Sequence, residues 1–391
     1  MRDVYVVGIG ITSFTRLEYP LVEIASYPGL MALRDSGLSK IDHLYVANMG
    51  GGRVNHQTGL ASAVVDHISL TPAGAETIEN GPASGASAIK QGYMAVASGM
   101  HDVVMVTGAE RMREVNNLEA TDFVATLTHP HAEYIYGVTL PALAGMFTRL
   151  YMEKYGVTSR HLGMVAVKNH AHAMDNFYAH LHQPITLEGI LDSPEASTNN
   201  PMVADPLRFF DCCPVSDGGA CVILATAEIA KKLNKPLIRL AGIGQATDSH
   251  CVHERQEPTD LLAVREASKK AFAMAGLKPK DVHVAELHDA FTILEIVESE
   301  ECGFFKKGEG HLALEQGVTR LGGKLPINTS GGLKAKGHPV GATGIGQAHE
   351  IVLQLRGDAG KRQVKNAKVG FTCNFGGFGN NVVCLVFTRE N

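Results

Sequence analysis

The sequence predicts an α/β protein made of two duplicated halves, with mostly parallel sheets covered by helices on both faces. The first observation is a repeated strand: the apolar run VYVVGIGIT at 4–12 recurs as IRLAGIGQAT at 238–247. The second is a repeated helix, turn and strand, found as ALRDSGLSKIDHLYVAN at 32–48 and AFAMAGLKPKDVHVAEL at 271–287. Two repeats in the same order indicate duplication, and alternating strands and helices favour parallel sheets.

Each half continues in the same way beyond these repeats. A glycine-rich turn leads into a helix at 81–98 and again at 337–356, and a strand ending in glycine follows each, as VVMVTGAERM at 103–112 and KVGFTCNFGGFG at 368–379. Residues 113–205 break the repeat and are rich in His, Asn and Met, so we expect an inserted loop domain that lies over the site. The predicted domains are 1–235, which includes this insertion, and 236–391.

Composition restricts the classes of function. The chain has 391 residues, 45% of them hydrophobic, and a net charge of −5, so it lacks the basic field that nucleic acid binding needs. The start MRDVYVVGIG has no cationic leader and no apolar run could span a membrane, so we expect a cytoplasmic protein without membrane contact. Seven cysteines, with Cys212 beside Cys213, favour reduced thiols over a disulfide framework.

Three motifs of the second half follow predicted strands or open predicted helices, where α/β proteins place their sites. They are HDAFT at 288–292, NTSGGLKAKGHPVGATG at 328–344 and CNFGGFGNN at 373–381. Together with Ser216-Asp217-Gly218 and over essentially the whole chain, they resemble the thiolase superfamily, in particular the sterol-carrier-protein and archaeal acetoacetyl-CoA types. The resemblance implies the thiolase fold, coenzyme A as a co-substrate and no covalently bound cofactor.

The resemblance also implies roles for individual residues. Thiolase chemistry builds negative charge on a thioester oxygen, which a positioned imidazole stabilises, and His338 and His288 are expected to flank that oxygen. Cys373 matches the C-terminal cysteine or histidine of the family and is the expected acid or base. We also assign substrate contacts to Ser330 and Gly376, and to His131 in the insertion, for which a plain loop role is an equal alternative.

The family's acyl-carrying cysteine is replaced here. That cysteine lies about three residues before the glycine that opens a helix, and Gly85 together with Gly108-Ala109-Glu110-Arg111-Met112 sets the register, so the matching residue is Pro82. Proline has neither a thiol nor a backbone N–H for the oxyanion hole of an acyl-enzyme. Ser84 is an unfavourable substitute, because its side chain should point elsewhere.

The histidines His170, His172, His180 and His182 invite a metal-site interpretation. A spacing of two residues does not align side chains on one helix face, and no carboxylate completes a ligand set. We therefore predict no metal site, and a solvated helix and loop at these positions.

Three functional hypotheses follow from the intact histidines and the missing cysteine. The first is thiolysis of a β-ketoacyl-CoA by direct attack of free CoA, with acyl transfer of a bulky or aromatic group such as that of benzoylsuccinyl-CoA. The second is a retro-aldol lyase acting on β-hydroxyacyl-CoA, like the cysteine-less aldolases of steroid side-chain degradation. Those aldolases are thought to carry tyrosines where this chain has His288 and His338, which favours the first hypothesis. The third is a non-catalytic subunit of an acyl-CoA complex.

The resemblance implies two kinds of partner. Thiolases dimerise through their sheet cores, so we expect a homodimer. Relatives of the archaeal type work with a small CoA-binding protein that has a zinc ribbon and an oligonucleotide-fold domain. This chain has no zinc-ribbon cysteine spacing of its own, so such a partner would be a separate polypeptide.

Overall fold

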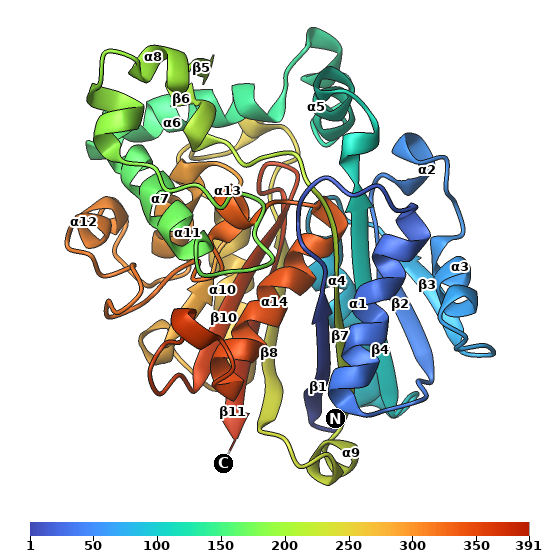
Figure 1. Ribbon diagram of the computed structural model, residues 1–391. Helices are drawn as coiled ribbons and strands as arrows, with labels where there is room; N and C mark the ends of the chain where they lie inside the picture. The colour runs from blue at the N-terminus through green and yellow to red at the C-terminus, as the bar shows by residue number, and fades with distance from the viewer. Residues whose placement is uncertain (391) are drawn as a thin grey trace.

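A single nine-stranded sheet forms the centre of the computed structural model, which describes residues 1–390 (Figure 1). In spatial order the strands are β3 (Gly74–Ile78), β2 (His43–Ala47), β4 (Val103–Arg111), β7 (Asp217–Thr226), β1 (Val4–Ile11), β8 (Leu237–Thr247), β11 (Asn381–Glu390), β10 (Val369–Gly376) and β9 (Val284–Glu286). A small separate hairpin pairs β5 (Met202–Ala204) with β6 (Leu207–Arg208).

The strand order carries the duplication. From the centre of the sheet outward, the first half has the order β1, β7, β4, β2 and the second half has the order β8, β11, β10, β9. In each half, the strand that comes first in the sequence therefore lies next to the strand that comes last, β1 next to β7 and β8 next to β11. Within each half every strand runs in one direction except the last, β7 or β11, which is antiparallel to both of its neighbours. The predicted α/β class and the common direction of most strands in each half are confirmed. In place of the two separate sheets that the duplication suggests, one continuous sheet is found, because β1 and β8 pair through Tyr5–Arg239 and Val6–Ile238.

Helices cover the sheet on both faces. They are α1 (Leu21–Ser36), α2 (Gly51–Val54), α3 (Leu60–His67), α4 (Ser84–Ser98), α5 (Asn117–Ala125), α6 (Leu140–Tyr155), α7 (Ser159–Ala173), α8 (Ala196–Asn199), α9 (Ala227–Lys232), α10 (Leu262–Ala275), α11 (Thr292–Glu301), α12 (Gly310–Glu315), α13 (Gly332–Lys336) and α14 (Val340–Arg356). Alternation along β4 shows the layers, because Val104 and Val106 pack with α4 and α14 while Val103 and Met105 pack with α1 and α3.

Helices α4 and α14 form the central layer, since the same hydrophobic cluster includes residues from both halves of the sheet. Their close crossing explains the small residues at the start of α4. A Cβ atom added at Gly85 would lie 2.9 Å from the backbone nitrogen of Gly344. Any larger residue at position 85 would push the two helices apart, so the glycine-rich turns of the two halves meet in the middle of the molecule.

The segment between β4 and β7, for which the sequence predicts an inserted loop domain, contains helices α5 to α8. Helix α7 packs against α11, α12 and α13 of the second half and lies beside α11 and α13 in Figure 1, while α6 shares a hydrophobic cluster with second-half residues. The insertion therefore joins the two halves above the carboxyl ends of several strands. Among residues 1–390, no helix is both long enough and apolar enough to cross a membrane.

Candidate active site

A cavity of about 140 Å³ lies between the insertion and the two motif loops of the second half. Its lining is mostly apolar, with polar atoms supplied chiefly by His288, His338 and the thiols of Cys212 and Cys213. Pro82 at the start of the α4 turn also lines it. The remaining lining residues are Met112, Ala120, Thr121, Val124, Leu140, Pro141, Pro214, Val215, Ala290, Phe291, Leu294, Val340, Phe375, Gly377 and Phe378. An apolar cavity with a few convergent polar groups is typical of a small-molecule site.

His288 is held from three sides in the loop after β9. Its backbone N–H donates to Glu298 Oε2 at 2.8 Å, and its ring stacks on Phe375 with centroids 5.3 Å apart and planes 3° apart. The backbone N–H of Phe375 donates to Nδ1 of His288 at 3.4 Å. Because Nδ1 accepts this hydrogen bond, it carries a lone pair, and the proton of the neutral ring lies on Nε2.

His338 lies between α13 and α14 and has the opposite tautomer. Its Nδ1 is 2.6 Å from Oγ1 of Thr343, and that hydroxyl donates to the carbonyl oxygen of Pro339 at 3.0 Å. A hydroxyl whose proton is directed to a carbonyl accepts from Nδ1–H, which leaves a lone pair on Nε2 of His338. The two imidazole centroids are 4.9 Å apart with planes at 88°. The site thus pairs one imidazole donor with one imidazole acceptor.

Both rings are neutral. Burial, together with Lys336, lowers the pKa of His338 to about 3. Burial, together with His338, lowers the pKa of His288 well below its ordinary value. Desolvation dominates because both side chains are enclosed, and a charged imidazole would lose its hydration there. A neutral imidazole can act as a proton acceptor at neutral pH, which an imidazolium cannot.

The GHP turn is held in place by the first half. The backbone N–H of His338 points to Oγ of Ser216 at 3.4 Å, within the Ser216-Asp217-Gly218 motif. Glu110, which is buried, accepts from the backbone N–H groups of Gly50 at 2.8 Å and Gly341 at 3.0 Å. Burial raises the pKa of Glu110 to about 7, and the N–H of Gly50 opposes that rise. The sequence signature around Glu110 therefore anchors the start of α14 next to His338.

Cys373, the expected acid or base, is buried and does not line the cavity of about 140 Å³. The strand β10 is buried on both faces, and Cys373 belongs to the hydrophobic cluster that packs against α10 and α11. Burial and the neighbouring Cys302 raise the pKa of the Cys373 thiol well above its usual range. The next residue, Asn374, does not line the cavity either, but its side chain reaches the turn at Pro82 and the ring of His288. Its amide donates to the carbonyl of Pro82 at 3.0 Å and lies 3.2 Å from Nδ1 of His288.

The three residues expected to contact substrate lie in three different environments. Ser330 is fully buried, its hydroxyl donates to Glu286 at 2.5 Å, and it does not line the cavity of about 140 Å³. Gly376 lines a second cavity of about 640 Å³, which shares Gly377 with the first. His131 is exposed on the loop before α6 and lines neither of these two cavities.

Ser84, in the turn around Pro82, is not a free nucleophile. That hydroxyl is buried, donates to the carbonyl of Gly81 at 2.6 Å and accepts from the N–H of Asn80 at 2.8 Å. The backbone N–H groups of Ala83 and Ser84 donate to the carbonyls of Asn80 and Gly81. Ser84 therefore shapes the turn and does not point to the cavity.

The four histidines of the insertion have separate structural partners. His170, His172, His180 and His182 bond respectively to Gln183 O, Asn328 O, Ser216 Oγ and Asn176 O. His170 and His172 are buried, so the expectation of a solvated helix is wrong for α7. The pattern misleads because α7 packs against the distant second half, which no local periodicity reveals.

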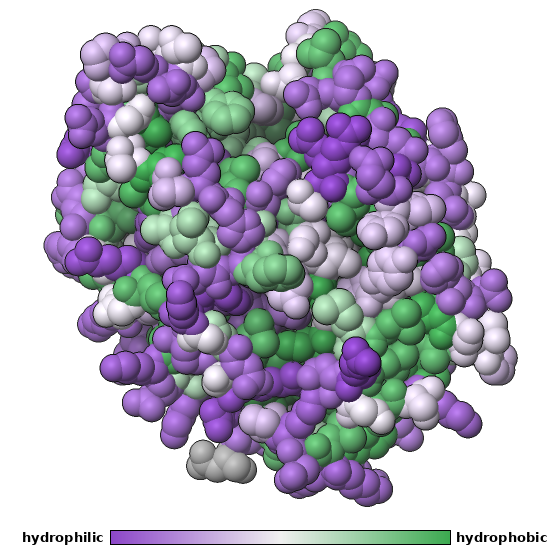
Figure 2. Space-filling model, in the orientation of Figure 1, coloured by the Kyte–Doolittle hydropathy of each residue, from purple (hydrophilic) through white to green (hydrophobic). Residues whose placement is uncertain are grey.

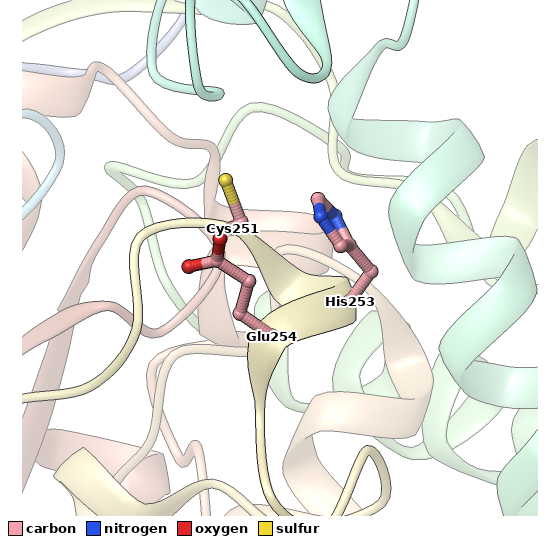
Figure 3. A group of neighbouring side chains, drawn as sticks. All are labelled: Cys251, His253 and Glu254. Atoms are coloured by element: carbon pink, nitrogen blue, oxygen red, sulfur yellow. The ribbon is translucent and has the colours of Figure 1, made fainter.

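One other group of metal-ligand side chains occurs among residues 1–390. Cys251, His253 and Glu254 come from a single 3-10 turn, and their ligand atoms lie within 4.8 Å of one another (Figure 3). Figure 3 shows the three side chains spreading from this turn, and His253 and Glu254 are exposed. None of the three lines either cavity described above.

Comparison with known proteins assigns the family. Residues 4–228 match the model "Thiolase, N-terminal domain", and residues 244–389 match "Thiolase C-terminal domain-like". The acetyl-CoA acetyltransferase of Methanothermobacter thermautotrophicus is 42% identical over 392 residues, and all of both chains is covered. Human sterol carrier protein 2 is 32% identical, over 98% of this chain and 72% of that protein. This chain belongs to the thiolase family, and the predicted family and fold are confirmed.

Solved structures extend the comparison. A structure named "Ltp2-ChsH2(DUF35) aldolase" superposes with a TM-score of 0.85 at 26% identity, covering 100% of this chain and 98% of that one. An acetyl-CoA acetyltransferase from Syntrophomonas wolfei superposes with a TM-score of 0.74 at 19% identity over the whole of both chains and shares the fold. Relatives named for acetyl transfer to CoA support thiolase-family acyl-CoA chemistry.

Proposed function

We propose that this protein makes or breaks a carbon–carbon bond next to a CoA thioester without an acyl-cysteine intermediate. The observation that carries the proposal is the arrangement of His288 and His338 above an apolar cavity that Pro82 also lines. Proline at the position of the acyl-carrying residue cannot form a thioester, so the acyl group passes directly between substrates.

The two imidazoles have different roles in the cleavage of a β-ketoacyl-CoA. Nε2 of His338 takes the proton of the CoA thiol as sulfur attacks the ketone carbon. The bond between that carbon and the α-carbon then breaks, and its electron pair forms a thioester enolate. The Nε2–H of His288 donates to the enolate oxygen, and His338 returns the proton to the α-carbon. The products are two acyl-CoA molecules, and no redox partner is needed.

The cavity favours a bulky apolar acyl group. Its walls are formed largely by aliphatic and aromatic side chains, and Phe291, Phe375 and Phe378 contribute aromatic rings. Burying an apolar group there stabilises the bound substrate in proportion to the area removed from water. The phenyl ring of an aromatic acyl group, such as that of benzoylsuccinyl-CoA, is one apolar group of this kind.

Retro-aldol cleavage of a β-hydroxyacyl-CoA is the second candidate. The observation in its favour is the likeness to the solved structure named as an aldolase. In that reaction Nε2 of His338 takes the proton of the β-hydroxyl, the carbon–carbon bond breaks to an aldehyde or ketone, and His288 again holds the enolate oxygen. Parallel assays with β-ketoacyl-CoA and β-hydroxyacyl-CoA panels separate the two reactions.

A separate CoA-binding protein is proposed as a partner. The solved aldolase that resembles this chain carries in its name a second component with the designation DUF35. We expect the partner of this chain to be a small protein with a zinc ribbon and an oligonucleotide-fold domain. Co-expression with small neighbouring open reading frames, followed by size-exclusion chromatography, tests the association. Full activity of the chain alone on its true substrate would count against a required partner.

Exchange of α-protons with deuterated water tests the shared half of both reactions. With acetyl-CoA and 3-phenylpropanoyl-CoA as probes, and with the partner present, wild type should exchange. His338→Ala and His288→Ala should each exchange about a hundredfold to a thousandfold more slowly, the usual cost of a lost donor or base. His131→Ala, an exposed change, is the matched control. Intact mass should show no acyl adduct during turnover. A stable adduct, or wild type without exchange on any acyl-CoA, would contradict the proposal and favour a non-catalytic role.

A further inference from the structure

We infer that Asn374 is a positioning residue that keeps the proton of His288 on Nε2 and links that ring to the turn carrying Pro82. The inference rests on the proposed function for its catalytic meaning. Its structural content, the tautomer of His288, can be tested independently of any activity.

The hydrogen bonds of Asn374 determine which way its amide points. Oδ1 accepts from the backbone N–H of Ala86 at 3.3 Å, and Nδ2 donates to the carbonyl of Pro82 at 3.0 Å. An amide turned by 180° would face the carbonyl oxygen with its own oxygen and the N–H with its own amine. The side chain is fully buried, so water cannot repair such a mismatch.

The first turn of α4 explains why these two backbone groups are available. The first helical hydrogen bond is made by Ser87, whose N–H donates to the carbonyl of Ala83. One residue earlier, the N–H of Ala86 and the carbonyl of Pro82 would be the corresponding pair, and the amide of Asn374 bridges them instead. Buried helix ends need such partners. The asparagine therefore completes the turn from the neighbouring strand.

Helix α14 leaves space for this bridge. A Cβ atom added at Gly344 would lie 2.2 Å from Oδ1 of Asn374 and 2.5 Å from the nitrogen of Ala86. Glycine is thus required at position 344 for the amide to reach the turn. Three elements, α4, α14 and β10, meet at this one side chain.

The remaining amide proton of Asn374 acts on His288. With one N–H given to Pro82, the second lies toward Nδ1 of His288, at a nitrogen-to-nitrogen distance of 3.2 Å. Two donors, this amide and the Phe375 backbone, then face the same ring nitrogen. A protonated Nδ1 would meet both donors with a hydrogen, so the neutral ring holds its proton on Nε2, facing the cavity.

Asn374→Asp tests the inference with nearly the same shape. The carboxylate has no N–H to donate and would accept from Nδ1–H, so the tautomer of His288 should invert. Protein labelled with ¹⁵N-histidine reports the tautomer through long-range proton–nitrogen correlations, and His288→Gln assigns the signals. Wild type should show an unprotonated Nδ1 and a protonated Nε2, and Asn374→Asp the reverse. The exchange rate of the variant should fall about a hundredfold, as for a lost oxyanion donor.

Asn200→Asp is the matched control. Asn200 is also buried, donates to the carbonyl of Ile190 at 3.0 Å and accepts from the N–H of Phe210 at 2.8 Å, remote from His288. It should leave the His288 signals unchanged. If Asn374→Asp does not fold, Asn374→Ala serves: only the Phe375 N–H then faces Nδ1, so the His288 signals should shift partly toward the tautomer protonated on Nδ1, and the exchange rate should fall about tenfold.

The outcomes are distinguishable. A His288 ring that keeps its proton on Nε2 in the folded variants, with exchange within threefold of wild type, would overturn the inference. An inverted tautomer in Asn374→Asp supports it even if no acyl-CoA exchanges in wild type, a result that would contradict only the proposed function.

Discussion

At the scale of single residues, one step along β10 separates Cys373, which packs in the hydrophobic core, from Asn374, which bonds to Pro82 and lies beside His288. The sequence CNFGGFGNN identifies the correct strand end, and the other two motifs identify His288 and His338, whose rings do come together. The sequence does not reveal which residue of β10 contacts His288, because every position of β10 is buried and the strand lacks polar alternation. The bond of Asn374 to Pro82 depends on a contact between distant segments, which no local pattern contains.

Cys373→Ala should leave α-proton exchange within about threefold of wild type, because the buried thiol does not line the cavity. The lost packing should lower the free energy of unfolding by about 1 to 2 kcal/mol, a modest cost for a small buried side chain. Exchange rates and urea unfolding measure the two effects separately. An exchange rate reduced a hundredfold in a variant that unfolds like wild type would show that the thiol takes part after all.

The low pKa of His338 predicts that the rate of α-proton exchange does not fall as the pH is lowered toward 5.5. Burial and Lys336 lower this pKa to about 3, so the ring remains an unprotonated acceptor from pH 5.5 to 8. The rate of α-proton exchange should therefore show no loss near pH 6.5, where an ordinary histidine would protonate. A pH profile of exchange in constant ionic strength checks this. A fall with an apparent pKa of 6 to 7 would mean that the cavity is more hydrated than the packing indicates.

At the scale of elements, the patterns of glycine and small residues predict where helices begin and pack closely, whereas the composition of the insertion does not predict which of its residues are buried. The turn that opens α4 is recognisable from its small residues, and Gly85 meets the backbone of Gly344 at the α4–α14 crossing. The histidines and asparagine of α7 suggest a solvated helix. Its buried face is satisfied by the second half, with Asn169 bonding to Asp289 and Glu295 and His172 to Asn328. Such polar packing has no periodic signature in one sequence.

His172 should make the stability of α7 depend on pH. Nδ1 lies 2.9 Å from the carbonyl of Asn328, Nε2 accepts from the N–H of Leu321 at 3.0 Å, and burial with Lys168 lowers the pKa to about 3. A depressed folded pKa gives stability that is present above pH 6.5 and lost as pH falls from 6.5 toward 3. The stability advantage of wild type over His172→Gln should shrink by about 2 kcal/mol between pH 7.5 and 5.

Urea unfolding at both pH values measures this advantage. His131→Gln, which removes an exposed histidine, is the matched control. A constant difference between wild type and His172→Gln across the range would mean that His172 takes up a proton as readily in the folded protein as in the unfolded chain, contrary to its two hydrogen bonds.

At the scale of the whole molecule, the duplication predicted from two repeated segments is visible in the order of the strands. How the halves join cannot be predicted from the sequence. The pairing of Val6 with Ile238 joins two largely apolar strands, and neither run of residues identifies the other strand as its partner. The surface in Figure 2 mixes hydrophobic and hydrophilic residues, with hydrophobic residues also visible in the hollow at its upper edge. One end of the sheet, β3, pairs only with β2 and is largely exposed.

The exposed strand β3 predicts a homodimer in which a second copy continues the sheet. Neighbouring residues Glu76 and Thr77 point to opposite faces, yet both are exposed in the single chain. An open edge strand pairs readily with another, and a two-fold axis would bring the same strand of each copy together. Light scattering after size-exclusion chromatography should give about twice the chain mass of 41.8 kDa for wild type. Thr77→Lys should give the monomer, because edge lysines oppose pairing, while Thr198→Lys on exposed α8 should not. A monomeric wild type, or a Thr77→Lys protein that remains dimeric, would place the interface elsewhere.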